Sequence, residues 1–158
     1  MKRTVIIYAS NHGTTRKVAE KIAQNLKKND VTLHNIGKDE KIDLSPFNQI
    51  IIGGSIHAGM IQRRLQTFIR KNMAILLEKP LGLFLCCMHE EEAQNQFNKA
   101  FPELLRHHAK SQQWVGGEFL FENMNFIEKF MVKKIAGIKD STSKLDEDKI
   151  DAFAEEMD

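Results

Sequence analysis

The sequence is poor in cysteine, and its two cysteines stand side by side. Adjacent residues such as Cys86 and Cys87 cannot easily form an unstrained disulfide. The pattern Cys-Cys-x-His is not a structural zinc spacing, and neither a partner base nor an arginine at phosphatase spacing accompanies the thiols. We therefore interpret both cysteines as small buried hydrophobic residues of a protein from a reducing compartment.

Long apolar runs and a strong charge of one sign are also missing. No apolar stretch approaches membrane-spanning length, and the N-terminus enters a predicted strand almost at once, which leaves no signal peptide. The 23 basic and 21 acidic residues give a net charge of +2, too small to argue for nucleic acid as a partner. We expect a cytoplasmic protein that does not bind nucleic acid and forms one domain over residues 1–158.

The common nucleotide-binding fingerprints are absent too. The chain contains neither G-x-x-x-x-G-K-[ST] nor G-x-G-x-x-G. Instead, Ser10-Asn11-His12-Gly13-Thr14-Thr15 joins an apolar predicted strand to an amphipathic helical pattern. Hydroxyls and free amides at a helix N-terminus can hold the phosphate of a monoester such as FMN. The alternative is an ordinary helix cap, in which Ser10 or Thr14 caps the helix and Gly13 eases the turn.

Strand-like and helix-like patterns alternate along the chain. Strands are expected over residues 3–9, 31–36, 48–53, 81–87 and 114–121, and helices over 16–28, 61–76, the segment through Phe97, a segment starting at Pro102, and 145–157 with Ser143 as its cap. This alternation predicts an α/β fold, a doubly wound five-stranded parallel sheet in the order 2-1-3-4-5. Such sheets bind ligands beyond the carboxyl ends of strands one and three. The loop Ser10–Thr15 should therefore lie beside a second glycine-bearing loop, Gly53–Gly59.

A helical excursion at about residues 122–142 is longer than a connection requires. Apolar residues recur in it at helical spacing, with lysines on the other side: Phe126, Ile127, Phe130, Met131, Ile135 and Ile138, against Lys129, Lys133 and Lys134. A helix of this kind either packs on the domain or serves as a lid or docking surface, including a peripheral contact with a membrane.

These pieces together resemble the flavodoxin-like FMN proteins, and among them the bacterial menaquinone-dependent protoporphyrinogen oxidases. The resemblance is carried by the two glycine-bearing loops and by Phe130-Met131-Val132-Lys133 in the excursion. It implies FMN as cofactor. In the implied site, the phosphate is held by Ser10, Asn11, His12, Gly13, Thr14 and Thr15. One side of the isoalloxazine ring is bordered by Ser55, Ile56, His57, Ala58 and Gly59. The other side of the ring is approached by Cys87, Met88 and His89.

The resemblance also implies an activity: oxidation of a porphyrinogen substrate in heme biosynthesis, with electrons passed from FMN to a quinone or a redox protein, in the cytoplasm or at the inner face of the membrane. Candidates to pair with propionate carboxylates are Arg63, Arg64, Arg70, Lys133 and Lys134. We assign no catalytic residue and no metal ligand.

Two features leave alternatives open. Neither ring-flanking loop carries the aromatic residue that many flavodoxins stack on the flavin, so His57 either stacks there or is a solvated loop residue. The chain could also be a flavodoxin-type electron carrier without substrate chemistry, although such carriers are usually strongly acidic. A phosphorylation-receiver domain is set aside, because its acidic residues are missing at the ends of strands one and three.

Overall fold

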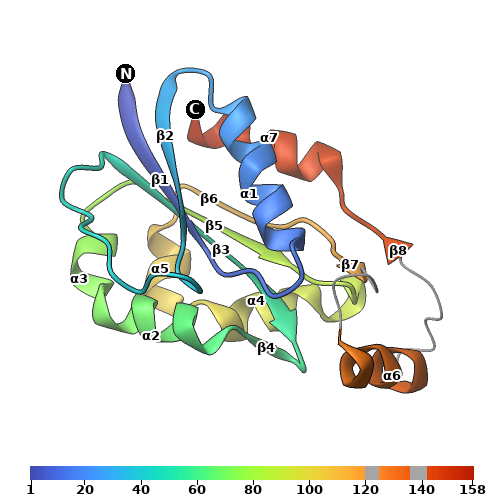
Figure 1. The fold of residues 1–158 in the computed structure, drawn as a ribbon. Coiled ribbons are helices and arrows are strands. Elements are labelled where there is room, and N and C mark those ends of the chain that lie inside the picture. The colour runs from blue at the N-terminus through green and yellow to red at the C-terminus, as the bar shows by residue number, and fades with distance from the viewer. Residues whose placement is uncertain (120–124, 136–141) are drawn as a thin grey trace.

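The computed structural model describes residues 1–119, 125–135 and 142–158. A parallel sheet in the spatial order β2-β1-β3-β5-β6 forms its centre (Figure 1). The strands are β1 (Lys2–Tyr8), β2 (Asn29–Asn35), β3 (Gln49–His57), β5 (Leu81–Cys86) and β6 (Ser111–Trp114). Numbered among the parallel strands alone, this is the order 2-1-3-4-5, so the predicted doubly wound α/β fold is confirmed.

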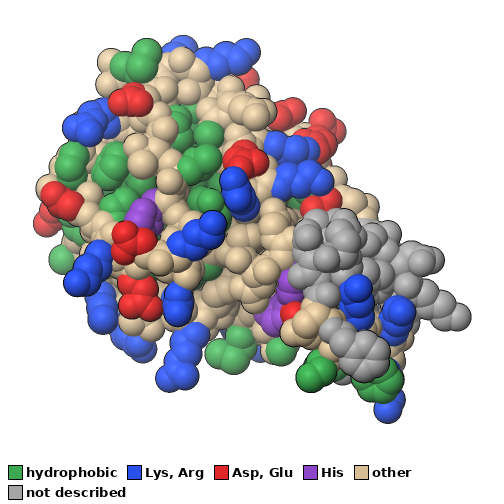
Figure 2. Space-filling model, viewed as in Figure 1, with side chains coloured by type: hydrophobic (Ala, Val, Ile, Leu, Met, Phe, Trp, Pro, Cys, Tyr) green, Lys and Arg blue, Asp and Glu red, His purple; other side chains and the backbone are tan. Residues whose placement is uncertain are grey.

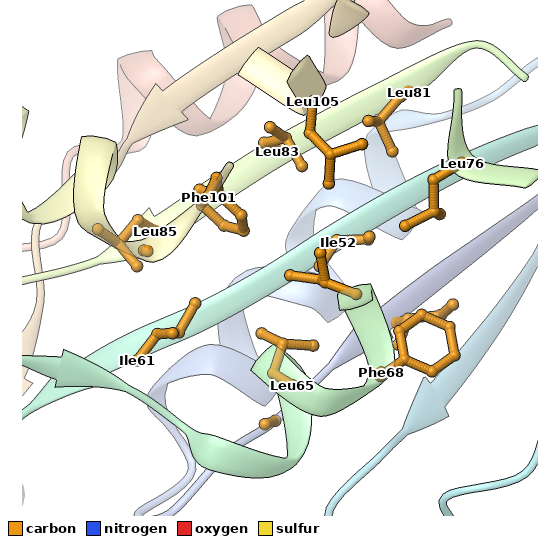
Figure 3. Close-up of a cluster of buried hydrophobic side chains, with 14 of the residues drawn as sticks. Ile52, Ile61, Leu65, Phe68, Leu76, Leu81, Leu83, Leu85, Phe101 and Leu105 are labelled. Atoms are coloured by element: carbon orange, nitrogen blue, oxygen red, sulfur yellow. The ribbon is translucent and has the colours of Figure 1, made fainter. Parts of the chain in front are cut away.

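Helices cover both faces of the sheet (Figure 1). One face carries α1 (Thr14–Asn25) and α7 (Glu147–Met157), and the other carries α2 (Arg63–Lys71), α3 (Met73–Leu76), α4 (Ala93–Ala100) and α5 (Glu103–His108). Each face buries its own apolar cluster, and Figure 3 shows the one beneath α2 to α5. Successive residues such as Ile51 and Ile52 enter opposite clusters. The central strands are therefore continuously apolar, as expected for a sheet buried on both sides.

Several helix boundaries differ from the prediction. The first helix begins at Thr14 rather than Arg16. The helix expected over 61–76 is divided at Asn72, whose side-chain amide donates to the Phe68 carbonyl (2.8 Å) and so satisfies an acceptor at the end of α2. Ser143 is not the cap of the last helix, because the Asp146 side chain accepts from the Lys149 amide (3.1 Å). The helix start at Pro102 is confirmed.

The predicted loop Gly53–Gly59 is wrong over its first five residues. β3 continues through both glycines to His57, turns at Ala58 (φ 50°) and Gly59 (φ 78°), and pairs with the short antiparallel strand β4 (Met60–Ile61). Side chains at these glycines would collide with the core, because a Cβ at Gly53 would lie 1.9 Å from the Phe84 ring. Gly53 therefore serves strand packing rather than a turn.

The fifth strand also lies earlier than predicted. β6 ends at Trp114, and the chain turns at Gly116 (φ 78°), where a Cβ would lie 1.9 Å from the Lys144 carbonyl oxygen. Beyond the turn, β7 (Glu118–Phe119) pairs antiparallel with β8 (Thr142–Ser143) in a separate two-stranded sheet. Residues 120 and 121 of the predicted strand lie outside the described residues.

The predicted helical excursion contains α6 (Phe126–Ile135), which stands beyond the carboxyl ends of the strands, next to β7 and β8 (Figure 1). Ile127, Phe130 and Met131 are exposed on it, and Figure 2 shows hydrophobic and basic side chains together in this region of the surface. Ile138 lies outside the described residues. Within the described ranges, no helix has both the length and the apolar character needed to cross a membrane.

Candidate functional site

A cavity of about 510 Å³ lies at the carboxyl edge of the sheet, between the loop after β1, the end of β3, the end of β5 and α6. Most of the residues predicted to contact the cofactor line it: Ser10, Asn11, His12, Thr14, Thr15, Ser55, Ile56, His57, Ala58, Gly59, Cys87, Met88 and His89. Gly13 does not line the cavity. The loop after β1 and the end of β3 thus lie side by side as the topology predicts, and the His12 and His57 ring centroids are 5.2 Å apart.

The loop after β1 leaves the N-terminus of α1 open to an anion. Gly13 is the N-cap residue, in the left-handed region (φ 97°), and its amide donates to the Ser10 hydroxyl (3.1 Å). Among the described residues no side chain caps α1, and its first turn contains no acidic residue. The free amides of this turn and the positive end of the helix dipole therefore face the cavity, and no acidic side chain of the first turn neutralises them.

Two buried polar atoms at the cavity lack an oxygen or nitrogen partner within the described part of the chain. They are Oγ1 of Thr15, in the first turn of α1, and Oε1 of Gln96, on α4. Thr15 as a whole is 1% exposed. Because buried polar atoms are nearly always hydrogen-bonded, these two indicate a site shaped for a polar ligand.

An acidic side chain also reaches the start of α1. The Glu118 carboxylate accepts hydrogen bonds from the Thr14 hydroxyl (3.3 Å), the Lys17 ammonium (3.0 Å) and the Ser143 hydroxyl (2.7 Å). Burial opposes its ionisation, but the bonds from Ser143 and Lys17 outweigh that effect and hold the pKa of Glu118 below its ordinary value. The first turn of α1 is thus joined to the β7–β8 pair through a charged contact.

The β3 side of the cavity is fixed by Gln62, which precedes α2. Its carbonyl oxygen accepts from the Ser55 amide (3.0 Å), and its amide group donates to the Ser55 hydroxyl (2.7 Å) and to the Ala9 carbonyl (3.2 Å). One side chain therefore holds the ends of β1 and β3 in a fixed relation. The backbone of Ile56 to Gly59 is left at the mouth of the cavity.

The β5 side presents thiols that are not activated. Burial raises the pKa of Cys86 to about 12 and that of Cys87 to about 11. The Cys87 amide donates to the Gly116 carbonyl (2.9 Å), which continues the strand pairing one residue beyond β5. Both thiols are free, in agreement with their interpretation as small buried residues.

The remaining wall comes from α6, which contributes Glu128, Met131 and Val132. Glu128 Oε2 lies 2.5 Å from His12 Nε2 and 3.3 Å from His57 Nε2. Sequence reasoning missed Glu128, Gln62, Gln96 and Glu118. For Glu128 a signal was present, because Asn125-x-x-Glu128 is the pattern of a helix capping box, and the structure forms both of its hydrogen bonds.

The basic residues proposed to pair with propionates are dispersed. Arg63 and Arg64 line a second cavity of about 370 Å³, which shares Ser10 and Asn11 with the first. Arg64 is already engaged by the Gly37 carbonyl and lies 3.5 Å from Glu40. The other three candidates, Arg70, Lys133 and Lys134, line neither cavity.

No Phe, Tyr or Trp stands among the described residues that line the larger cavity. The side chain of His57 is 49% exposed and lies against His12 and Glu128. The sequence left open whether His57 stacks on a flavin or is solvated. In this structure it is a partly solvated residue with two close partners.

Comparison with known proteins agrees with this architecture. A family model described as a flavodoxin domain matches residues 5–146. Protoporphyrinogen IX dehydrogenase [quinone] from Escherichia coli (strain K12) is 23% identical over 145 residues, covering 84% of this chain and 78% of that protein.

Among solved structures, a short-chain flavodoxin associated with a non-canonical PDU bacterial microcompartment has a TM-score of 0.60 at 15% identity, over 99% of this chain and 96% of that one. Oxidised flavodoxin 1 from Bacillus cereus has a TM-score of 0.53 at 17% identity, over 72% of this chain and 84% of that one. These two structural likenesses concern the fold, whereas the family model spans most of the sequence. The chain belongs to the flavodoxin-domain family, whose cofactor is FMN.

Proposed function

We propose that this protein is an FMN-dependent oxidoreductase that oxidises a porphyrinogen-like small molecule and passes the electrons to a quinone. The observation that carries the proposal is the cavity itself. It joins an open helix N-terminus to the ends of β3 and β5, and a helix that follows the last strand of the sheet closes its remaining side. Ligands of doubly wound sheets bind at this position.

The residues present fit FMN at its phosphate end. The phosphate would be held by the hydroxyls of Ser10, Thr14 and Thr15 and by the amides at the start of α1, with no lysine required. The Thr15 hydroxyl is the most specific support, because within the described residues it contacts only the buried Cys86 thiol and no oxygen or nitrogen, and a phosphate oxygen would be a stronger acceptor. Glu118 lies beside this end and should weaken phosphate binding rather than support it.

The flavin ring would lie between the backbone of Ser55 to Gly59 and the segment Cys87 to His89. Once bound, FMN supplies hydride and electron transfer. The chain's own part is to orient the ring, to keep water from it with Ile56 and Met88, and to leave one side accessible to substrate. Met131 and Val132 of α6 form the apolar wall against which the tetrapyrrole substrate would rest.

The substrate and the acceptor are supported by similarity to protoporphyrinogen IX dehydrogenase [quinone], which covers most of both chains. A quinone dissolved in a membrane also requires an approach to the lipid. Exposed Ile127 and Phe130 beside Lys129 suit a peripheral contact of α6 with an anionic membrane surface. Co-sedimentation with vesicles containing anionic lipid, compared with neutral vesicles, tests that contact.

The cofactor is tested with Thr15→Val, which removes the buried hydroxyl and keeps the shape of the side chain. A hydrogen bond to a charged acceptor contributes about 1.5–3 kcal/mol, so FMN affinity should fall about tenfold or more. The stability of the FMN-free protein should be maintained, because the buried hydroxyl that is lost has only the weakly hydrogen-bonding Cys86 thiol as its partner among the described residues. Thr32→Val, at an exposed position of β2, is the matched control and should change neither quantity.

The reaction is tested with FMN-loaded protein under anaerobic conditions, with protoporphyrinogen as donor and a soluble menaquinone analogue as acceptor. Formation of porphyrin fluorescence that depends on both FMN and quinone supports the proposal. Absence of FMN binding would overturn the whole assignment. FMN binding without porphyrinogen oxidation would leave an electron carrier, which can be tested by reduction with a flavodoxin reductase.

A further inference from the structure

We propose that His12, His57 and Glu128 form a binding site for a divalent transition-metal ion, of the kind that Zn²⁺ represents, at the mouth of the cavity. Each residue offers one ligand atom, and the three atoms lie within 4.8 Å of one another. They come from the loop after β1, the end of β3 and α6, which are far apart in the sequence. The inference does not depend on FMN.

The ligand chemistry suits such an ion. Two imidazole nitrogens and one carboxylate oxygen are an established zinc ligand set, which leaves a fourth position for water or another small ligand. With bonds of about 2.0–2.2 Å, neighbouring ligands of a tetrahedral ion stand about 3.3 Å apart. The distance of 3.3 Å between His57 Nε2 and Glu128 Oε2 already has this value. The distance of 2.5 Å between His12 Nε2 and Glu128 Oε2 is shorter, so His12 would move outward by about an ångström.

Glu128 is also oriented by a second layer of contacts. Its Oε1 accepts from the Asn125 backbone amide (3.3 Å), and the Asn125 side chain accepts from the Glu128 amide (2.8 Å). This reciprocal pair caps α6 and leaves Oε2 directed at the two histidines. Metal ligands are commonly fixed by hydrogen bonds of this type, which reduce the cost of ordering them.

The site can be reached from solvent. The side chains of His12, His57 and Glu128 are 15%, 49% and 27% exposed, so an ion can enter without unfolding the core. Bound there, it would connect α6 to the two loops at the carboxyl edge of the sheet. The cavity would then be bounded on that side by a coordinate link instead of a hydrogen-bonded contact.

The experiment uses the full chain, treated with EDTA and then titrated with Zn²⁺, with metal content measured after desalting. Co²⁺ absorption reports the coordination geometry independently. We expect one ion per chain and a loss of affinity of more than about tenfold in His12→Asn, His57→Asn and Glu128→Gln. His107→Asn is the matched control, because His107 also lies near a glutamate, 3.8 Å from Glu103, but on the solvent-exposed side of α5 and away from the cavity.

His57→Asn is the decisive variant if Glu128→Gln disturbs the cap of α6, because His57 is half exposed and holds no part of that cap. Binding that is substoichiometric, or equally strong in His57→Asn and wild type, would overturn the proposal. Loss of metal in Cys87→Ala with the three cluster variants unaffected would also overturn it. Repeating the titration with and without FMN separates this inference from the proposed function, since metal binding by the FMN-free protein stands on its own.

Discussion

Replacing Gly53 by alanine should destabilise the fold strongly, although only a methyl group is added. A Cβ at this position would lie 1.9, 2.1 and 2.3 Å from three atoms of the Phe84 ring. Ordinary van der Waals contact begins at about 3.5 Å, so the ring or the strand would have to move by more than an ångström. Phe84 is fully buried and packs edge-on against Phe153 (centroids 6.0 Å apart), so the ring has no free space to enter.

Overpacking of a core costs about 1–3 kcal/mol, and this site should fall at or above the upper end. For a chain of this length, a loss of about 3 kcal/mol lowers Tm by about 6–12 °C. Urea unfolding followed by circular dichroism gives the free energy of unfolding directly. Gly37→Ala is the control, because its Cβ would meet only the Asn35 side chain, at 3.1 Å, on the surface.

The mechanism is tested by a double-mutant cycle with Phe84→Leu. A smaller side chain removes the collision, so Gly53→Ala should cost clearly less in that background than in wild type. A loss below about 1 kcal/mol for Gly53→Ala alone would show that β3 and β5 separate without penalty, contrary to this reasoning. An unchanged cost in the Phe84→Leu background would show that the strain arises elsewhere.

Four further results are expected. The fold lowers the pKa of Glu118, so the ionised side chain stabilises the protein at pH values above the ordinary pKa of glutamate, and this contribution is lost as pH falls through the lowered pKa. Glu118→Gln should therefore flatten the acid side of a plot of unfolding free energy against pH. A plot parallel to that of the wild type would refute this. The same variant should bind FMN more tightly, measured by flavin fluorescence quenching, because a negative charge beside the phosphate loop is removed. Cys86 and Cys87 should resist alkylation by iodoacetamide at pH 8 in the native protein, because burial raises their pKa values to about 12 and about 11. Mass spectrometry should show that both react after denaturation. Rapid alkylation of the native protein would contradict this. Asp146→Ala should lower the free energy of unfolding by about 1 kcal/mol, because the N-cap of α7 is lost. Ser143→Ala should leave that cap in place. If both variants weakened the start of α7 equally, Asp146 would not be its cap.

The sheet and its order could be predicted from the sequence because each central strand is an apolar run with a polar or glycine-bearing segment after it. The same local view failed at Gly53, whose reason for being glycine is a phenylalanine thirty-one positions away in the next strand. A glycine that makes room for a neighbour and a glycine that turns the chain look alike until the partner is known. Gly116 shows the second case, with its left-handed backbone and the Lys144 carbonyl against it.

The candidate site divides in the same way. Residues next to the strand ends, such as Thr15 and Ser55, could be found from the topology, because the carboxyl ends of parallel strands share one edge. Glu118 and Glu128 could not be found in that way. They reach the cavity from β7 and α6, which lie outside the regular alternation of strand and helix, and nothing in their sequence spacing relates them to the loop after β1.

The pairing of β7 with β8 brings Phe119 and Thr142 together as ladder partners. The segment that runs from β7 to β8 therefore leaves and rejoins the rest of the fold at a single point. Because closing a longer loop adds little entropic cost, this segment can be exchanged or shortened while the parallel sheet is retained. Such an exchange would change the cavity, because α6 of this segment forms one of its walls. Grafting this segment between related chains would thus exchange one wall of the cavity at a point outside the parallel sheet.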